Sequence, residues 1–292
     1  MSLPVNKVST ADLVAAARAW HLRNKTPVFE DPFAAKLCGW VLQLALRYRP
    51  FEWILFELAL RPVMPVSMCV IMRARFAEDC LGKAVAEGTR QYVILGAGMD
   101  SFAFRRPDLM ERIQVFEVDH PVTQARKLQR LKRAGLPISR NHHFVAADLS
   151  LVSPLDALQE SPFDAAKPSF VSLLGVVYYL TRDNLAATAR SIAEGLPTGT
   201  RLVFDYLLDT ESSEARHLEV RQNMLDFVKK RGEPMRSDYS LADMNRLMES
   251  EGFGVVDSFA MTELAAKYIE RYGTQHFEFP GIFGFGNYEV AG

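Results

Sequence analysis

The chain has 292 residues, of which 49% are hydrophobic and 24% charged, and its 34 basic and 35 acidic residues leave a net charge of −1. This apolar fraction supplies a sizeable core, and the near-average charged fraction excludes a mainly disordered chain. The balanced charge argues against a broad nucleic-acid-binding surface, which needs a basic excess on at least one face. We therefore expect a globular protein with no nucleic-acid partner.

Targeting signals and metal motifs are missing from the sequence. The first ten residues, MSLPVNKVST, lack the basic-then-apolar pattern of a signal peptide. The longest charge-free run in the apolar N-terminal third, residues 62–72, is too short to span a bilayer. The three cysteines form no CxxC pair, and the six histidines show no metal-ligand spacing. We expect a cytoplasmic protein with free thiols, no membrane span and no metal site.

Residues 1–88 are predicted to form a helical cap. Ser9 with Asp12 resembles a capping box at the start of the first helix. Asp31, followed by a proline, predicts an N-cap for a helix over FAAKLCGWVLQLAL. The run FEWILFELAL is apolar on most faces, so it is either buried or covers something apolar. The last helix of the cap is expected over residues 67–87.

After residue 90 the pattern changes to short β-rich runs, each closed by a glycine or an aspartate. Five of them fall at residues 92–95, 114–118, 143–147, 170–174 and 201–204. Helical patterns separate several of these runs, as at residues 122–134 and 182–194, which indicates a parallel sheet built from βαβ units. Residues 207–252 are polar and mostly helical, and two further strands are expected at residues 255–260 and 282–290.

In such sheets, ligands bind at the carboxyl ends of the strands near the topological switch. Gly96 and Gly98, in LGAGMDS, follow the first strand and allow close approach of a ligand, although a simple turn explains them about as well. Asp119 ends the second strand, where a carboxylate accepts hydrogen bonds from both hydroxyls of a ribose. An N-cap for the following helix is compatible with that role. Asp148 ends the third strand and either binds the exocyclic amine of adenine or caps a turn.

The glycine loop also separates two classes of nucleotide cofactor. A dinucleotide fold prefers a third glycine, and the corresponding residue here is Ser101. Asp100 adds a negative charge that a pyrophosphate would disfavour and that a cationic sulfonium and ammonium would not. Glu117 is expected on the same strand face as Asp119, behind it.

Taken in order, the segments RQYVILGAGMDSFAFR, FEVDHP, AADL and LGVVYYL resemble the leucine carboxyl methyltransferase family, which are class I S-adenosylmethionine-dependent methyltransferases. The resemblance also includes EDPFAAKL and MRARFAED, and spans roughly residues 31–205. It implies an α/β fold with a doubly wound, seven-stranded, mostly parallel Rossmann-like sheet and a reversed last strand. It further implies an N-terminal helical cap (1–88) and a methyltransferase domain (89–292) with a helical insertion (207–252) after strand five.

The resemblance assigns cofactor-binding roles to eight positions. It implies that Arg73 pairs with the cofactor's carboxylate and that the glycine loop holds its methionine part. It also implies that Asp119 binds the ribose and that Asp148 and Leu149 contact the adenine. The eight are Arg73, Gly96, Gly98, Asp119, Asp148, Leu149, Leu174 and Gly175. Family members usually carry glutamate where this chain has Leu174. Four consequences of the missing glutamate stay open: weaker cofactor binding, a neighbouring residue that takes over its role, a changed substrate, or lost activity.

Methyl transfer is an in-line displacement that depends mainly on alignment, and a carboxylate acceptor needs no general base, whereas a hydroxyl acceptor does. The resemblance implies O-methylation, most simply of a carboxylate. Tyr179 and Tyr206, with Tyr178 beside them, are the candidates for positioning the acceptor. Arg105 and Arg106 either meet an anion or lie on a solvated turn.

Two apolar segments could form an acceptor pocket, although core packing explains most of their residues. They are residues 51–60 and the C-terminal phenylalanines Phe277, Phe279, Phe283 and Phe285. Without a charged groove for a protein partner, a small organic acid is favoured over a protein's C-terminal carboxylate. Two alternatives remain: a nicotinamide-dependent oxidoreductase, disfavoured by Asp100 and Ser101, and a binding protein with a degenerate site, suggested by Leu174.

Overall fold

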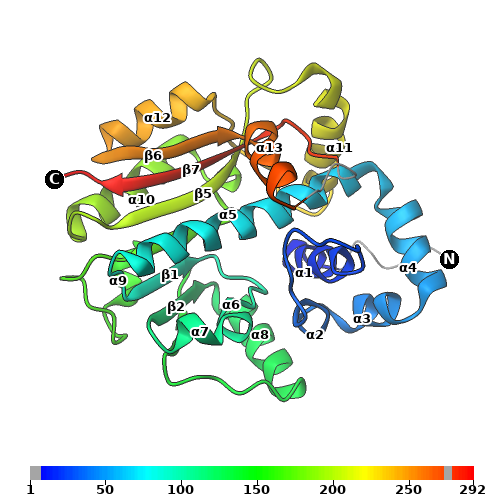
Figure 1. The fold of residues 1–292 in the computed structure, drawn as a ribbon, viewed down its shortest axis with the longest axis horizontal. Helices are drawn as coiled ribbons and strands as arrows, with labels where there is room; N and C mark the ends of the chain where they lie inside the picture. The colour runs from blue at the N-terminus through cyan, green and yellow to red at the C-terminus, as the bar shows by residue number, and fades with distance from the viewer. Residues whose placement is uncertain (1–7, 273–277) are drawn as a thin grey trace.

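A single sheet organises the chain in the computed structural model, which describes residues 8–272 and 278–292. Across these residues seven strands lie in the order β3-β2-β1-β4-β5-β7-β6 (Figure 1). They are Gln91–Leu95 (β1), Gln114–Asp119 (β2), His142–Ala146 (β3), Phe170–Leu173 (β4), Arg201–Leu207 (β5), Phe253–Ala260 (β6) and Phe283–Val290 (β7). Strands β1 to β5 pair in parallel, whereas β7 is antiparallel to both β5 and β6. The predicted seven-stranded sheet with a reversed last strand is confirmed.

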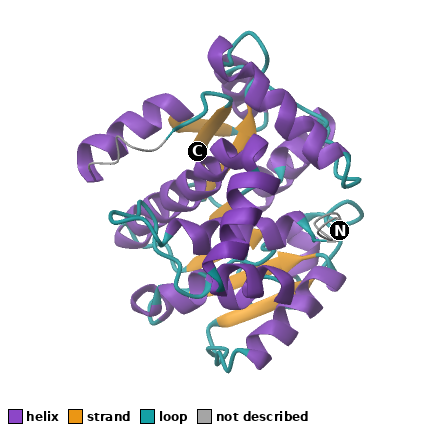
Figure 2. Cartoon of the chain, turned by 90° about the vertical axis from the view of Figure 1, so that its right-hand side faces the viewer, coloured by secondary structure: helices purple, strands orange, loops and turns teal. Residues whose placement is uncertain are grey.

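Helices cover both faces of this sheet (Figure 2). The N-terminal part contains Thr10–His21 (α1), Ala34–Leu37 (α2), Trp40–Arg47 (α3), Arg49–Trp53 (α4), the π-helix Ile54–Ala59 (η2), the 3-10 helix Arg61–Val66 (η3) and Ser67–Ala86 (α5). The remaining α-helices are Phe102–Arg105 (α6), Pro107–Met110 (α7), Pro121–Arg133 (α8), Pro154–Leu158 (α9), Arg182–Gly195 (α10), Leu218–Lys229 (α11), Leu241–Ser250 (α12) and Met261–Tyr272 (α13). Short 3-10 turns lie at Val177–Tyr179 (η4) and Ala215–His217 (η5).

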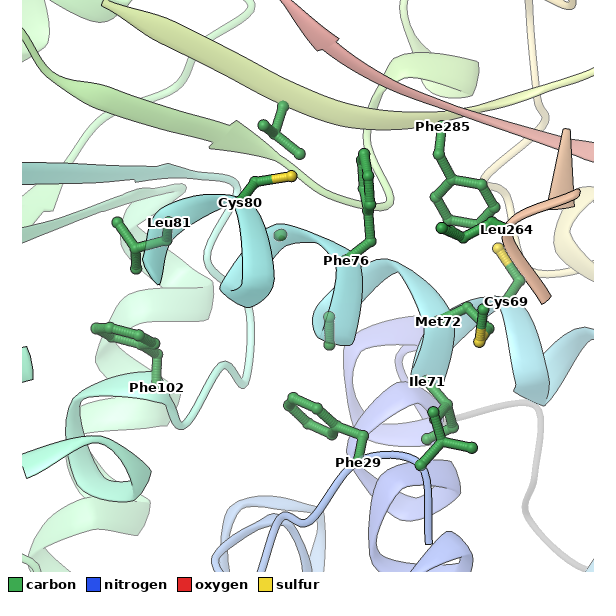
Figure 3. Packing of buried hydrophobic residues seen from close by; sticks show 14 of the residues in the cluster. Phe29, Cys69, Ile71, Met72, Phe76, Cys80, Leu81, Phe102, Leu264 and Phe285 are labelled. Carbon is green, nitrogen blue, oxygen red and sulfur yellow. The ribbon is translucent and has the colours of Figure 1, made fainter. Parts of the chain in front are cut away.

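The two faces of the sheet have separate apolar cores. Helix α5 runs along one face, where Phe76, Cys80 and Leu81 pack with Phe102 and Phe285 (Figure 3). On the other face, α10 and α12 cover the alternate residues of the same strands. Because side chains alternate along a strand, neighbouring residues of one strand enter different cores. This alternation decides which strand residues can reach a ligand.

Several predicted helix starts are confirmed at the level of their caps. The hydroxyl of Ser9 accepts from the Asp12 amide at 3.2 Å, and Thr181 accepts from the Asn184 amide at 3.2 Å. The single long helix expected after Asp31 is wrong, because the chain forms the short α2 and then α3, with Gly39 preceding α3. Asp31 does not cap a helix. Its carboxylate accepts from the Phe33 amide at 3.2 Å and is otherwise buried against partners from other segments, described below.

Strand β5 extends three residues beyond its predicted end, to Leu207. The extension exists because β7 pairs alongside it, with Leu207 opposite Phe283. Asp205 and Tyr206, predicted to follow the strand, therefore lie within it and point to opposite faces.

In the part of the chain that the structure describes, no individual helix has both the length and the apolar content needed to cross a membrane. One pair, Arg49–Ala59 with Arg61–Ala86, meets those criteria jointly but is bent by 86° at its break. The length and composition of this pair are the whole basis of the match.

Candidate functional site

A cavity of about 280 Å³ lies at the carboxyl ends of β1 and β4, the two strands between which the chain order of the sheet reverses. Six of the eight predicted cofactor residues line it. Five of the six follow or end a strand: Gly96, Gly98, Asp119, Leu174 and Gly175. Arg73 reaches it from α5. The expectation that ligand-binding residues follow the strands thus holds for the geometry of this cavity.

The loop after β1 is shaped by a glycine that no other residue could replace without displacement. Gly96 has a φ of +69°, and a Cβ there would lie 2.7 Å from Cγ2 of Val176, in the loop after β4. Its amide donates to the carbonyl of Val118 at 2.8 Å, which ties the loop to β2. The two loops at the switch point therefore touch, and the cavity lies beside this contact.

Asp119 links the end of β2 to the same loop. One carboxylate oxygen accepts from the Gly98 amide, and the other accepts from the His120 amide at 2.6 Å. Burial raises the pKa of Asp119 above its ordinary value. A carboxylate has about four acceptor positions, so Asp119 keeps capacity to accept from a pair of hydroxyls in the cavity.

Behind Asp119, Glu117 is buried as predicted for that strand face. It forms an ion pair with Lys127 of α8 and a 2.8 Å hydrogen bond with Nε2 of His142. Burial alone would raise the pKa of Glu117, but Lys127 and His142 hold it below its ordinary value. The Glu117 cluster fixes β2 against α8 and β3.

Arg73 is held at the cavity wall by two partners. Its Nη1 donates to the Tyr178 hydroxyl at 2.9 Å and lies 3.4 Å from Oδ2 of Asp205. The other oxygen of Asp205 accepts from the Gly175 amide at 2.6 Å. Gly175 has a φ of +74°, and a Cβ there would lie 2.6 Å from the Arg73 guanidinium. The guanidinium therefore rests directly on a glycine, and Asp205, which sequence reasoning did not single out, anchors both.

A second buried cluster, the Asp31 cluster, joins the cap to the glycine loop. Asp31 accepts from the Ser101 hydroxyl at 2.6 Å and lies 3.1 Å from Nε of Arg18 and 3.7 Å from Nε of Arg105. Asp31 also accepts from the Phe33 amide at 3.2 Å, so it closes a local turn as well as binding these partners. Arg105 does not lie on a solvated turn, because it pairs with Glu78 at 2.6 Å and donates to the Ser101 hydroxyl at 2.8 Å. The remaining member, Asp100, has an oxygen 3.7 Å from Nη1 of Arg18.

The charge of Asp100 matters because this residue also lines the cavity. Burial alone would raise its pKa, but the guanidinium groups of Arg18 and Arg105 hold it below its ordinary value. Asp100 is therefore anionic at neutral pH. Outside the cluster, Arg106 is partly exposed and pairs with Asp108 at 2.6 Å.

Part of the cavity lining comes from segments far from the sheet motifs. It consists of Ser9, which caps α1, of Thr10 and Val14 in the N-terminal half of α1, and of Glu233 from the loop after α11. The Thr10 hydroxyl donates to the Glu233 carboxylate across 223 residues of sequence. Sequence reasoning missed both residues, because a contact of this range leaves no local pattern.

A second, smaller cavity of about 110 Å³ meets the first one. The two share Thr10, Val14, Val70, Arg73, Tyr178 and Tyr179. The rest of its lining is almost entirely apolar and includes Phe56, Leu60, Met224 and Phe283. The prediction that residues 51–60 and the C-terminal phenylalanines line such a pocket is thus met by three residues. Phe279 and Phe285 are buried in the core instead, and Phe277 lies outside the described residues.

Three predicted site residues do not reach either cavity. Tyr206 points into the core on the opposite face of the sheet, because it alternates with Asp205 along β5. Asp148 accepts from the amide and the hydroxyl of Ser150, so it caps a turn, and Leu149 packs at the edge of the same core as Tyr206. Tyr179, in contrast, lines both cavities.

Comparison with known proteins adds to this geometry. The sequence profile of the family described as leucine carboxyl methyltransferase matches residues 11–193. YktD of Bacillus subtilis, provisionally named an S-adenosyl-L-methionine-dependent methyltransferase, is 34% identical over 276 residues, covering 89% of this chain and 90% of YktD. A Mycobacterium ulcerans protein with the same provisional name is 34% identical over 215 residues, covering 72% of this chain and 69% of that protein.

Solved structures share the fold at low sequence identity. A provisionally named methyltransferase of Thermobifida fusca superposes with a TM-score of 0.65 at 15% identity, covering 98% of this chain and 96% of that one. A DUF574 family protein of Streptomyces avermitilis gives a TM-score of 0.62 at 17% identity, with 95% and 97% covered. These two likenesses extend over nearly the whole of each chain.

Proposed function

Because the chain belongs to the leucine carboxyl methyltransferase family, we propose that it methylates the carboxylate of a small organic acid bound in the apolar cavity. Its class is that of an S-adenosylmethionine-dependent methyltransferase. Family membership thereby removes the ground for the nicotinamide-dependent alternative. The acceptor and the chemistry of the accepting group are the parts that we propose here.

The residues of the larger cavity fit the cofactor's functional groups. Arg73 offers a guanidinium for the carboxylate, and Asp119 offers acceptors for the ribose hydroxyls. Asp100 and Glu233 add carboxylates to the lining, which suit a ligand that carries a sulfonium and an ammonium. Gly96 and Gly175 let Val176 and the Arg73 guanidinium pack directly against the backbone beside the cavity. When bound, the cofactor supplies an activated methyl group, and the protein supplies alignment.

The observation that carries the acceptor proposal is the junction between the two cavities. Arg73, Tyr178 and Tyr179 stand at that junction, and no histidine lines either cavity among the described residues. Burial raises the pKa of both tyrosines, so each stays protonated and can donate. Because Arg73 donates to the Tyr178 oxygen, the phenolic proton is directed elsewhere. Such a junction suits an acceptor that is already anionic.

The cofactor assignment is tested by titrating S-adenosylmethionine into the protein in a calorimeter. We expect wild type to bind, and Asp119→Ala to lose about 1–3 kcal/mol of binding free energy because ligand hydroxyls lose their partner. Asp183→Ala, which removes an exposed carboxylate of α10 outside both cavities, is the matched control and should bind as wild type. Absence of binding by wild type would contradict the proposal.

The acceptor assignment is tested by transfer of a labelled methyl group to a panel of organic acids. A carboxyl methyl ester releases volatile methanol in mild base, whereas a methyl ether does not. We expect base-labile product. Base-stable product would assign a hydroxyl acceptor, and cofactor binding without turnover on any acid would favour the non-catalytic alternative raised by Leu174.

The three cysteines, which are free and buried, support our proposal of a cytoplasmic location.

A further inference from the structure

Large hydrophobic side chains are unusually exposed between residues 40 and 58. Helices α3 and α4 of this segment lie at the outer edge of the cap (Figure 1). Trp40 is 75% exposed and Trp53 is 57% exposed. We call the whole set the aromatic face: Trp40, Leu44, Tyr48, Phe51, Trp53 and Leu58. Every exposed aromatic among the described large hydrophobic residues belongs to this face, and the others exposed are aliphatic. Folded monomers seldom leave such a surface without a function.

Four exposed cations lie in the same part of the chain as the aromatic face. Lys36, Arg47, Arg49 and Arg61 are exposed, and none of the four makes an ion pair with any described residue. Lys36 and Arg47 border a groove that Trp40 and Leu44 also line. Of the two carboxylates on the same helices, Glu52 is buried and paired with Arg23, which leaves only Glu57 exposed. The surface is therefore apolar and positively charged, although the whole chain carries a net charge of −1.

This combination matches the surface of an anionic bilayer. Tryptophan and tyrosine rings favour the headgroup level of a membrane, and lysine and arginine side chains attract anionic headgroups. A second copy of the chain fits less well, because a symmetric contact would bring the four unpaired cations of each copy together. A peripheral mode is indicated, since α5, the longer member of the bent pair, is mostly buried in the core.

The inward side of the same segment forms part of the apolar cavity. Phe56 and Leu60 line that cavity, whereas Trp53 and Leu58, on neighbouring turns, point outward. One short stretch of chain thus separates the aromatic face from the place where we propose that the acceptor binds. An acceptor with an apolar tail would be concentrated at the membrane surface on which this stretch lies.

We infer that the aromatic face docks the protein on an anionic phospholipid surface, and that the acceptor is an amphiphilic carboxylic acid taken from that surface. The second part rests on the proposed function, with the acceptor's carboxylate at Tyr178 and Tyr179 and its tail toward Phe56 and Leu60. The first part rests on the exposed residues alone.

Docking is tested by sedimenting the full chain with two kinds of vesicle. One kind contains phosphatidylglycerol and is anionic, and the other consists of phosphatidylcholine alone. We expect wild type to bind the anionic vesicles, and Lys36→Glu with Arg49→Glu to weaken this binding by more than about tenfold. Trp40→Ser with Trp53→Ser should also release the protein, whereas Leu151→Ser with Val152→Ser, exposed elsewhere, should not. Thermal unfolding checks that each variant is folded. Equal binding by the aromatic variant and wild type, or no binding by wild type, overturns the inference.

Size-exclusion chromatography tests whether a second copy of the chain binds the aromatic face instead. A concentration-dependent dimer that disappears in the Trp40→Ser, Trp53→Ser variant would assign the face to a second copy and overturn membrane docking. A monomer at all concentrations, together with vesicle binding, supports it.

The acceptor is tested with hexanoate in solution and palmitate presented in anionic vesicles. The aromatic variant should methylate hexanoate as wild type does and should lose about tenfold or more on palmitate. Equal loss on both acids, or no loss on either, overturns the acceptor class while leaving docking to the sedimentation result. If wild type docks but methylates neither acid, the amphiphilic acceptor class is overturned and docking stands, while the panel of organic acids decides the proposed function.

Discussion

Asp205 is the residue whose replacement tests the wall of the cofactor cavity most directly. Its side chain is 0% exposed, and it holds both the Arg73 guanidinium and the Gly175 amide. Asp205→Asn keeps the shape and one acceptor oxygen for Gly175, but it removes the negative charge opposite Arg73. The substitution therefore isolates the ion pair from the packing around it.

The expected cost follows from the burial of the pair. Removing one partner of a buried ion pair costs about 3–5 kcal/mol, because the other charge is left uncompensated. Arg73 keeps its 2.9 Å hydrogen bond to Tyr178 and faces the cavity, so we expect the lower end, about 3 kcal/mol. Against a typical stability of about 5–15 kcal/mol, the variant should still fold.

Urea denaturation, followed by fluorescence and circular dichroism, measures this cost from the midpoint and slope of unfolding. Asp148→Asn is the control, since that carboxylate is 38% exposed and outside both cavities, and it should stay within about 0.5 kcal/mol of wild type. If Arg73 receives the cofactor's carboxylate, saturating S-adenosylmethionine should raise the Tm of Asp205→Asn more than that of wild type. A variant as stable as the control would refute the view that Asp205 neutralises Arg73.

Three further predictions concern the same region. Gly175→Ala should lose both cofactor affinity and stability, because the added Cβ meets the Arg73 guanidinium at 2.6 Å. Gly135→Ala, at a positive φ but with open space around it, should lose only about 1–2 kcal/mol of stability. Calorimetry measures the affinity of each variant and urea denaturation measures its stability. Since burial raises the pKa of Asp119, cofactor affinity should fall as the pH is lowered toward that pKa, and Asp119→Asn should bind more weakly but without this pH dependence in titrations at several pH values. The pKa of Glu117 is depressed in the folded state, so its stabilisation is present above the unfolded pKa and is lost as the pH falls through the folded one; Glu117→Gln should flatten the acid limb of stability against pH, and an unchanged limb would contradict it.

Local patterns were sufficient to predict the sheet and the strand-end residues of the cavity. Gly96 and Asp119 follow short apolar runs, and this arrangement puts both at one edge of a parallel sheet. The side-chain caps at Ser9 and Thr181 are equally local, since each hydroxyl binds an amide three residues on. For these residues the sequence neighbourhood contains the structural cause.

Other residues depend on partners that no window of sequence contains. Asp31 has the local pattern of a helix cap and accepts from the Phe33 amide, but its carboxylate also binds Arg18 and Ser101, which no local pattern predicts. Tyr206 was misplaced because the pairing of β5 with β7, nearly eighty residues further along, fixes where the strand ends. Glu233 shows the same limit, since its role in the cavity lining depends on Thr10.

The Asp31 cluster also determines how the protein comes apart. Arg18 and Asp31 lie in residues 1–88, and Arg105 lies in residues 89–292. Separating the two segments would therefore leave charged groups of this cluster without their partners. The boundary at residue 88 therefore separates two segments of the sequence that we expect to unfold together. Heating should produce one cooperative heat-absorption peak for cap and sheet together, and a fragment that begins after residue 88 should not behave as an autonomous folding unit.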